Sequence, residues 1–202
     1  MIKNITQNNE EKIEFKYNLK KLDGSVIFGY DSQEDFAKNL QENKNELQNT
    51  EFMDLDLSDL VIDNYDFSDS KFTNCIFKKS EINNCNFENS NFVNCDLTAC
   101  NFVNCNLRTI DNRNNTYLNT SYQRSDLTNS SFLKEDINNS DFSFCKMINC
   151  EFSDTDFSNI IFEKTEAEWS CFNDCTITKD QYEFLKQFKG TTFLNIKIKK
   201  IL

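Results

Sequence analysis

The chain has 202 residues, of which 38% are hydrophobic, and its 33 acidic and 22 basic residues give a net charge of −11. It contains no His, no Pro and only 3 Gly, which removes the commonest general base and metal ligand and excludes a Gly-rich phosphate loop. No apolar run is long enough to span a bilayer, and the first residues lack the apolar core of a signal peptide, so we expect a cytoplasmic protein.

Residues 1–50 predict a cap made of a β-hairpin and a helix. Apolar side chains alternate over 13–19 and 26–30, on either side of Asp23-Gly24, a dipeptide typical of hairpin turns. A helix is expected to follow, capped by Asp31 with Glu34 or by Ser32 with Asp35. Its apolar face would consist of Phe36, Ala37, Leu40 and Leu47.

From Phe52 to Ile177 a large apolar residue, here called the centre, recurs every fifth position for 26 units. The position two before each centre is mostly small, with eight Cys, seven Ser and four Thr, and is called the small position. Inward residues thus alternate at spacings of two and three, which neither a helix nor a strand accepts. The chain must turn once per unit, and a short fixed period of this kind indicates a solenoid.

Units such as Cys85-Asn86-Phe87-Glu88-Asn89 and Ser140-Asp141-Phe142-Ser143-Phe144 resemble the pentapeptide-repeat family. The resemblance covers roughly residues 50–178 and implies an all-β solenoid, a right-handed quadrilateral β-helix of about six coils. The residue two after the centre is Asn in twelve units, and Asn tolerates left-handed turn conformations. We therefore expect three segments: a cap at 1–50, the β-helix at 51–177 and a C-terminal element at 178–202.

Several units break the pattern. Asn112 replaces a large centre, and we expect a coil to bulge into a loop there, with Arg113 adding a base. Ala167 is a small centre near Trp169, the single Trp, which would either fold over the gap or lie exposed. Glu135 occupies an inward small position and must be displaced or find a partner.

Residues 178–202 predict a helix and a short strand. Thr178-Lys179-Asp180-Gln181 is a capping box, Gly190 ends the helix, and alternating apolar residues follow up to Ile201-Leu202. The strand has three possible roles: closing the solenoid, docking on the hairpin, or forming a dimer seam. In the quinolone-resistance proteins that the repeat resembles, the C-terminal element dimerises, which implies a homodimer here through Phe184, Leu185, Phe188, Ile196 and Ile198.

Neither catalysis nor metal binding has a distinctive motif. Eight of nine Cys lie at the small position on different walls, so we interpret them as core residues rather than zinc ligands, and only Cys171 should face outward. Carboxylates are plentiful but belong to the repeat, and no His or Gly-rich elbow accompanies the Ser and Thr. We expect no cofactor and no enzymatic activity.

Charge is the more informative signal. Residues 51–177 carry 22 acids and 9 bases, a net of −13, whereas the flanking segments carry −2 and +4. Duplex DNA has one charge per ~1.7 Å, so a length of about 31 Å, the expected length of the rod, carries about 18 charges. The net charge of −13 is of the same order. The family resemblance adds that some members bind DNA gyrase or topoisomerase IV as duplex mimics. The candidate contact residues are Asp56, Asp96, Asp136 and Asp156 on one face, with Arg113; direct binding of nucleic acid is disfavoured.

Two alternatives remain beside mimicry. An acidic surface also keeps proteins soluble, and outward apolar residues such as Phe144 and Ile161 would suit a protein–protein interaction scaffold without topoisomerase activity.

Overall fold

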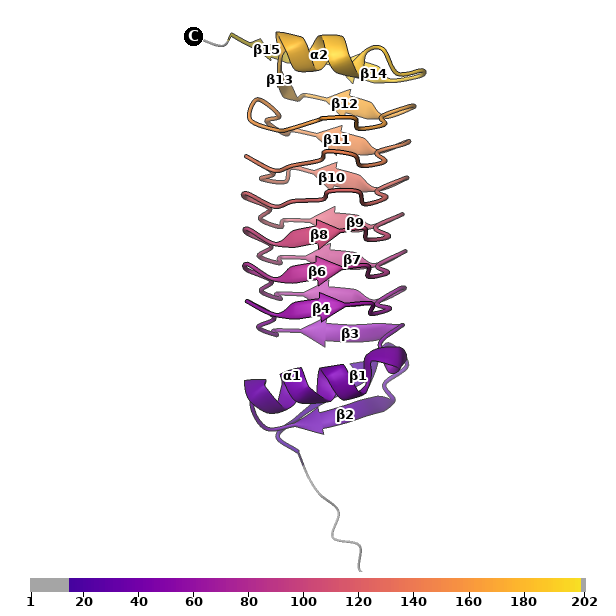
Figure 1. Ribbon diagram of the computed structural model, residues 1–202, viewed down its shortest axis with the longest axis vertical. Helices are drawn as coiled ribbons and strands as arrows, with labels where there is room; N and C mark the ends of the chain where they lie inside the picture. The colour runs from indigo at the N-terminus through magenta and orange to yellow at the C-terminus, as the bar shows by residue number, and fades with distance from the viewer. Residues whose placement is uncertain (1–14, 201–202) are drawn as a thin grey trace, which may run out of the picture.

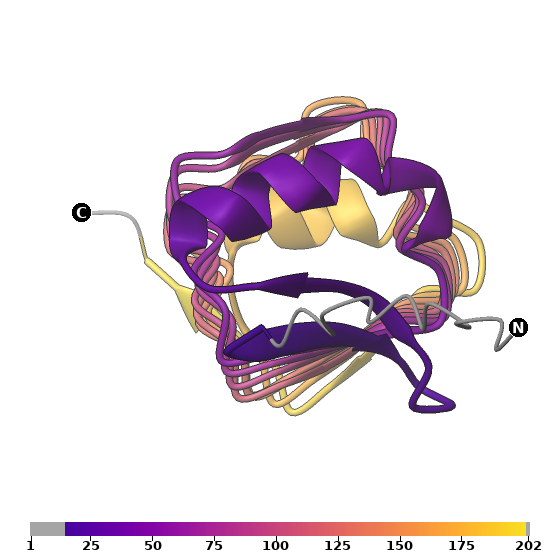
Figure 2. The same cartoon turned by 90° about the horizontal axis from the view of Figure 1, so that it is seen from below.

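The computed structural model describes residues 15–200, and they form a four-sided rod closed at both ends by other elements (Figures 1 and 2). The elements outside the repeats are β1 (Tyr17–Lys21), β2 (Val26–Tyr30), α1 (Gln33–Glu42), the 3-10 turn η1 (Lys44–Glu46) and α2 (Lys179–Leu185). The predicted solenoid is confirmed, with about seven turns rather than six, because residues after 190 add to it.

The side of the rod that contains the centres Phe52 to Phe172, here side 1, carries most of the regular strands. They pair in parallel, each 20 residues from the last, so that Phe52 lies beside Phe72 and Phe72 beside Phe92. In order they are β3 (Thr50–Met53), β5 (Lys71–Thr73), β7 (Asn91–Val93), β9 (Asp111–Arg113), β10 (Ser131–Leu133), β11 (Glu151–Ser153) and β12 (Cys171–Asn173).

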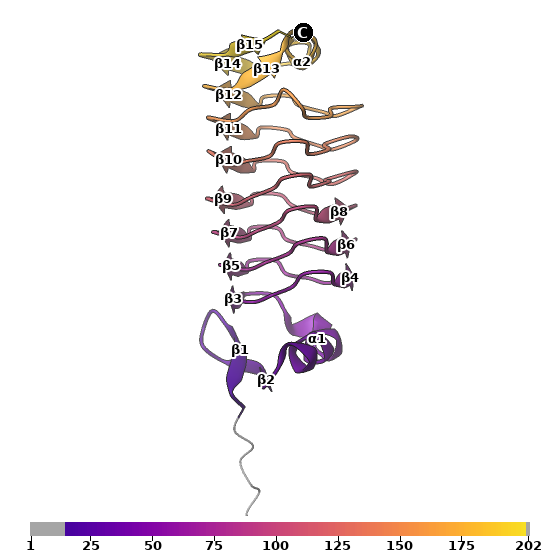
Figure 3. The same ribbon diagram turned by 90° about the vertical axis from the view of Figure 1, so that its left-hand side faces the viewer.

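Sides 2, 3 and 4 follow in chain order, with first centres Leu57, Ile62 and Phe67. The strands β4 (Val61–Asp63), β6 (Glu81–Asn83) and β8 (Asn101–Val103) lie on side 3, which faces away from side 1 (Figure 3). Elsewhere the coils are joined by single parallel bridges at the same 20-residue spacing. The sequence phase therefore determines the register directly.

The backbone conformation at the corners of the rod explains which residue types occur there. From Asp54 to Asp174 the residue two after the centre has a φ between 53° and 63° at all but one corner. Asn suits this left-handed conformation, and its side chain can also donate to the corner of the preceding coil, as Asn94 Nδ2 does to Asn74 Oδ1 at 3.3 Å. Phe144 and Trp169 occupy this corner position, which is why both rings are exposed.

The small position has a hydrogen-bonding role that the repeat pattern did not reveal. At most units its side chain donates to the carbonyl of the residue 23 before it, and at several units it also accepts the backbone N–H of the residue 20 before it. Ser130 Oγ, for example, lies 3.2 Å from Ile110 N and 2.7 Å from Leu107 O. Ser, Thr and Cys can do both, so their prevalence reflects hydrogen bonding as well as size.

The N-terminal elements cover the first coil as predicted. β1 pairs antiparallel with both β2 and β3, so the hairpin continues the sheet of side 1. Ser32 caps α1 by accepting the Asp35 N–H, and Phe36 and Leu40 are buried. Leu47 is also buried but lies beyond the helix, after η1. Ile13, part of the expected hairpin, lies outside the described residues.

At the other end, α2 begins with the predicted capping box, in which Thr178 and Gln181 exchange side-chain-to-backbone hydrogen bonds. The following segment closes the solenoid, the first of the three roles considered. β14 (Thr192–Leu194) pairs in parallel with β12, and β15 (Lys197–Lys199) pairs in parallel with β13 (Thr176–Thr178). No helix between residues 15 and 200 is long and apolar enough to cross a membrane.

Candidate interaction surface

The four predicted aspartates lie on side 2, at the position before the centre. Parallel bridges connect Asp56 to Asp96 through Ile76, and Asp96 to Asp136 through Thr116. Asp156 occupies the same position one repeat coil after Asp136 and bridges to Thr176. Stacked coils are about 4.8 Å apart, so the carboxylates form one column along the rod, here called the aspartate column.

Each carboxylate in the column also stabilises its own turn. Asp56 Oδ1 accepts the N–H of Ser58 at 2.9 Å, and Asp136 Oδ1 accepts that of Asn138 at 3.2 Å. Asn86 does the same for Glu88 on side 4, at 3.1 Å. The preference for Asp or Asn here is thus structural, whereas the choice of Asp over Asn determines only the charge.

The four carboxylates differ in their ionic partners. Asp96 lies 2.8 Å from Lys78 Nζ, and Asp156 lies 3.9 Å from Lys199 Nζ. Burial tends to raise the pKa of Asp96, but hydrogen bonds from Lys78 and Thr98 outweigh it and hold the pKa below the ordinary value. Within residues 15–200, Asp56 and Asp136 have no ion-pair partner within 4.0 Å.

The loop expected around Asn112 is wrong. Asn112 is the fully buried middle residue of β9, in register with Phe92 and Phe132. Its amide replaces aromatic packing with hydrogen bonds: Nδ2 donates to Ser131 O at 3.0 Å, and Oδ1 accepts the Tyr117 hydroxyl. Because these partners satisfy the amide, the strand continues without a bulge.

Arg113 projects from the outer surface of β9 on side 1, not from the side of the aspartate column. Its guanidinium forms an ion pair with Asp111 at 2.7 Å and remains largely exposed. The structure therefore brings together the four aspartates but places Arg113 on the adjacent side.

The five predicted dimer residues are distributed over the C-terminal end. Leu185 is fully buried in the rod's own core, and Phe184, Phe188 and Ile196 are partly buried against it. The rings of Phe184 and Phe188 pack edge to face at 5.3 Å. Only Ile198 is exposed, with 50% of its surface accessible to solvent.

A further half-coil at this end escaped the sequence analysis. Phe193 stacks on Phe172 with ring centroids 5.4 Å apart, Ile198 pairs with Ile177, and Asn195 has the corner φ of 54°. The five-residue spacing of Phe193 and Ile198, with Asn195 between them, is the signal. It was missed because α2 shifts the coil spacing from 20 to 21 residues.

Eight cysteines lie buried at the small position, as predicted, and Cys171 is partly exposed. Burial raises the pKa of Cys145 and Cys150 to about 12, so these thiols stay protonated near neutral pH. Their Sγ atoms donate to the carbonyls 23 residues earlier, at 2.6 Å for Cys145 and 2.9 Å for Cys150. Among residues 15–200, no three His, Cys, Asp or Glu side chains converge on a possible metal position.

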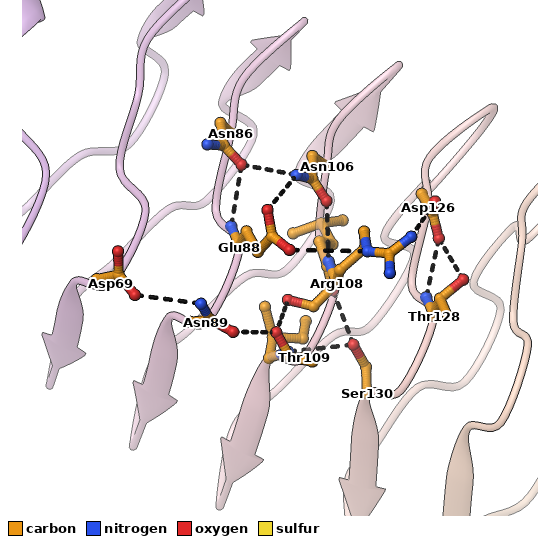
Figure 4. A network of polar contacts seen from close by, with 12 residues as sticks. Asp69, Asn86, Glu88, Asn89, Asn106, Arg108, Thr109, Asp126, Thr128 and Ser130 are labelled. Carbon is orange, nitrogen blue, oxygen red and sulfur yellow. Dashed lines mark hydrogen bonds and ion pairs between the residues drawn. The ribbon is translucent and has the colours of Figure 1, made fainter.

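Side 4 illustrates how the outer polar side chains connect the coils (Figure 4). Asn106 Nδ2 donates to Asn86 Oδ1 at 2.9 Å, and Arg108 lies between Glu88 at 3.7 Å and Asp126 at 3.6 Å. These charged side chains are between 28% and 43% exposed, so each ion pair contributes at most about 1 kcal/mol. Arg108 is thus engaged with acids of both neighbouring coils.

A second exposed feature lies at the corner between sides 3 and 4. The Phe144 ring is 40% exposed, and the Arg124 guanidinium and Lys164 ammonium lie 5.5 Å and 5.0 Å from its centroid. We call Arg124, Phe144 and Lys164 the corner stack. It combines two cations with an accessible aromatic edge on an otherwise acidic rod.

Two family models match the repeats of this chain. One, described as "Pentapeptide repeat region", matches residues 65–142, and the other, "Pentapeptide repeats (8 copies)", matches residues 123–163 and 140–178. No curated protein is significantly similar to the chain in sequence.

Several solved structures are similar. A trypsin-treated form of QnrB1, a plasmid-mediated fluoroquinolone resistance protein, is 16% identical, with 75% of this chain and 85% of that chain covered and a TM-score of 0.39. A pentapeptide-repeat protein of the Arabidopsis thaliana thylakoid lumen is 14% identical, covering 69% and 75%, with a TM-score of 0.32. HetL of Nostoc sp. strain PCC 7120, involved in heterocyst differentiation regulation, is 9% identical, covering 82% and 92%, with a TM-score of 0.33.

The family assignment depends on the repeat models, which together match residues 65–178, more than half of the chain. With this match, and with the four-sided solenoid that the repeats build, the chain belongs to the pentapeptide-repeat family.

Proposed function

We propose that the protein is a non-enzymatic, cytoplasmic binding protein whose acidic rod mimics duplex DNA and occupies the DNA-binding groove of a type II topoisomerase, either DNA gyrase or topoisomerase IV. The observation that carries the proposal is the aspartate column, which aligns four carboxylates along one side of a straight rod. A groove that binds duplex DNA presents cations along its length, so a linear anionic surface is complementary to it.

The dimensions support the same idea. Eight strands, from β3 to β14, stack in parallel on side 1. At about 4.8 Å per coil they extend over roughly 34 Å, which corresponds to about one turn of duplex DNA. The net charge of −13 between residues 51 and 177 is of the same order as that of such a length of duplex. A homodimer through the C-terminal end, using the exposed Ile198 and its partly buried neighbours, would lengthen this surface.

The test removes charge without removing the turn bonds. Asp→Asn at 96, 136 and 156 retains an Oδ1 acceptor for the N–H two residues on, as Asn86 and Asn106 already provide at the same repeat position. The matched control is the triple change Asp66, Asp126 and Asp141→Asn, which removes equal charge from the same repeat position on sides 3 and 4. We expect the first variant to lose inhibition of gyrase supercoiling, or quinolone protection, at a given salt concentration, while the control retains most of it.

Equal losses in both variants would mean that net charge, and not the column, determines binding. If the wild-type protein has no effect on gyrase or topoisomerase IV at any concentration, the topoisomerase proposal is wrong.

The corner stack favours a second candidate function, an interaction scaffold. Its exposed aromatic edge and flanking cations would suit an acidic, apolar segment of a protein partner. Phe144→Ala with Arg124→Ala should then abolish capture of that partner by the purified rod, whereas the Asp→Asn variants should not. Loss of capture in the Asp→Asn variants instead would contradict this second function.

A further inference from the structure

The middle of the rod contains a buried polar cluster that the proposed function does not use. It consists of Asn112, Asn115, Tyr117 and Glu135, all less than 5% exposed. Asn115 Nδ2 donates to Phe92 O at 2.9 Å and lies 3.2 Å from the Tyr117 hydroxyl, which in turn donates to Asn112. Three members of the cluster thus satisfy one another.

Glu135 is the exception. It occupies a small position on side 2. In the preceding coil Asn115 occupies the equivalent position, where it accepts the Cys95 N–H and donates to the Phe92 carbonyl. Glu135 Oε2 performs the first task and accepts the Asn115 N–H at 2.6 Å. A carboxylate has no hydrogen for the second task. The acceptor expected from the 23-residue offset is the carbonyl of Asn112, and Oε1 is buried without a hydrogen-bond partner.

The surroundings offer no cation to the carboxylate within the described part of the chain. The ionisable groups that face it are Cys95 from the preceding coils, Tyr117, Tyr122 and, at longer range, Asp111 of β9. The Arg113 guanidinium of β9 is turned outward onto Asp111. The chain neighbours Lys134 and Asp136 are exposed.

Two buried polar atoms in this region lack hydrogen-bond partners. The Tyr122 hydroxyl is buried and lacks a partner, as Oε1 does. A proton on Glu135 would remove the buried charge and supply the missing donor, restoring the two-way bonding found at Ser130 and Ser125. An ionised Glu135 would instead place a charge between two coils with no cation beside it, countered only by the backbone N–H groups of Asn115 and Asn114.

We propose that Glu135 is a pH-sensitive latch, held as the neutral acid in the folded rod, and that its ionisation loosens the contact between the β9 and β10 coils. The inference is independent of the proposed function, because it concerns the cohesion of the rod rather than its partner.

The direction of the pH effect follows from burial. Burial is the main cause that raises the pKa of Glu135 to about 7 from its ordinary value of 4.5. A raised folded-state pKa means that the folded chain binds more protons than the unfolded chain between these values. The stabilising contribution is therefore fully present below pH 4.5 and is lost as the pH rises through about 7.

The test compares unfolding of the full chain by urea, under reducing conditions, at about pH 5 and about pH 8. Glu135→Gln retains an acceptor and supplies a permanent donor, and Asp136→Asn is the matched control at the adjacent exposed position. Between about pH 5 and about pH 8, the unfolding equilibrium constant of the wild type should rise by roughly 70-fold relative to that of Glu135→Gln. Asp136→Asn should keep the wild-type dependence on pH.

The same pH dependence in Glu135→Gln and the wild type would overturn the proposal. Because a core variant can fail to fold, a carboxyl ¹³C NMR titration of Glu135 in the wild-type protein provides an independent measurement. A midpoint near neutral pH, with amide exchange over 111–117 and 131–137 accelerating above it, is the expected result. A midpoint in the ordinary range of exposed glutamates would refute the latch without any variant.

Discussion

Ser130→Ala tests whether the small position is a hydrogen-bonding position or only a small one. The change barely alters volume, so packing alone predicts little effect. It removes two bonds, however: the Ile110 N–H loses its acceptor at 3.2 Å, and the Leu107 carbonyl loses its donor at 2.7 Å. Ile110 is 3% exposed and Leu107 is 1% exposed, so water cannot replace the hydroxyl without disturbing the core.

The magnitude follows from the two orphaned groups. Each buried unsatisfied backbone group costs about 1–3 kcal/mol, so Ser130→Ala should lower the free energy of unfolding by about 2–6 kcal/mol. Ser130→Cys should cost less, because a thiol already makes both bonds elsewhere: Cys85 Sγ lies 3.5 Å from Tyr65 N and 3.6 Å from Ile62 O.

Urea denaturation followed by circular dichroism, with reductant present, measures all three variants. The control is Ser131→Ala, at the next position on the outer surface of β10, which should change stability by less than about 0.5 kcal/mol. If Ser130→Ala is no more destabilising than this control, the small position is filled for size alone and the hydrogen-bonding role is refuted.

Two other predictions use paired substitutions. Phe102 is 1% exposed and stacks on Tyr122 at 5.5 Å, so Phe102→Ala should lower the free energy of unfolding by about 3–5 kcal/mol, measured by urea denaturation. Phe144→Ala, at an exposed corner, should lower it by less than about 1 kcal/mol. Equal losses would mean that the centres do not form the core. Gly190→Ala would place a Cβ in steric overlap with the Trp169 ring at a φ of +76°, and should displace that ring and change the fluorescence of the only Trp. Gly24→Ala is the control, because Gly24 has a φ of +87° but no atom within 4 Å of an added Cβ, so the change introduces backbone strain without a clash. Equal losses of stability in Gly24→Ala and Gly190→Ala would contradict the contact between Gly190 and Trp169.

Much of the fold follows from sequence because the controlling interactions repeat. The five-residue phase determines which residues point inward and which stack, so the pairing of Phe52 with Phe72 needs no further information. The helix caps at Ser32 and Thr178 depend on residues three positions away, and such local signals are visible in a single sequence.

The features that sequence did not predict depend on distant partners. Asn112 looked like a break in the repeat because its hydrogen-bond partners, the Ser131 carbonyl and the Tyr117 hydroxyl, can be recognised only once the coils are stacked. The pairing of β14 and β15 with the solenoid was hidden because α2 changes the spacing between paired residues from 20 to 21. The placement of the aspartate column followed from the phase, whereas the pairing of Asp96 with Lys78 depends on side-chain conformations that the repeat does not specify.

The constant offset between bonded residues has a consequence for how such a chain can change in length. Deleting or duplicating 20 residues would leave every ladder partner equivalent and every side chain on its original side. Inserting a single five-residue unit would also preserve the alternation of small and large inward residues, yet it would rotate everything beyond it by a quarter turn. The interior tolerates both changes, but only the first keeps Asp56, Asp96, Asp136 and Asp156 aligned. Outer-surface composition, and not the core, therefore decides which insertions such a rod can accept.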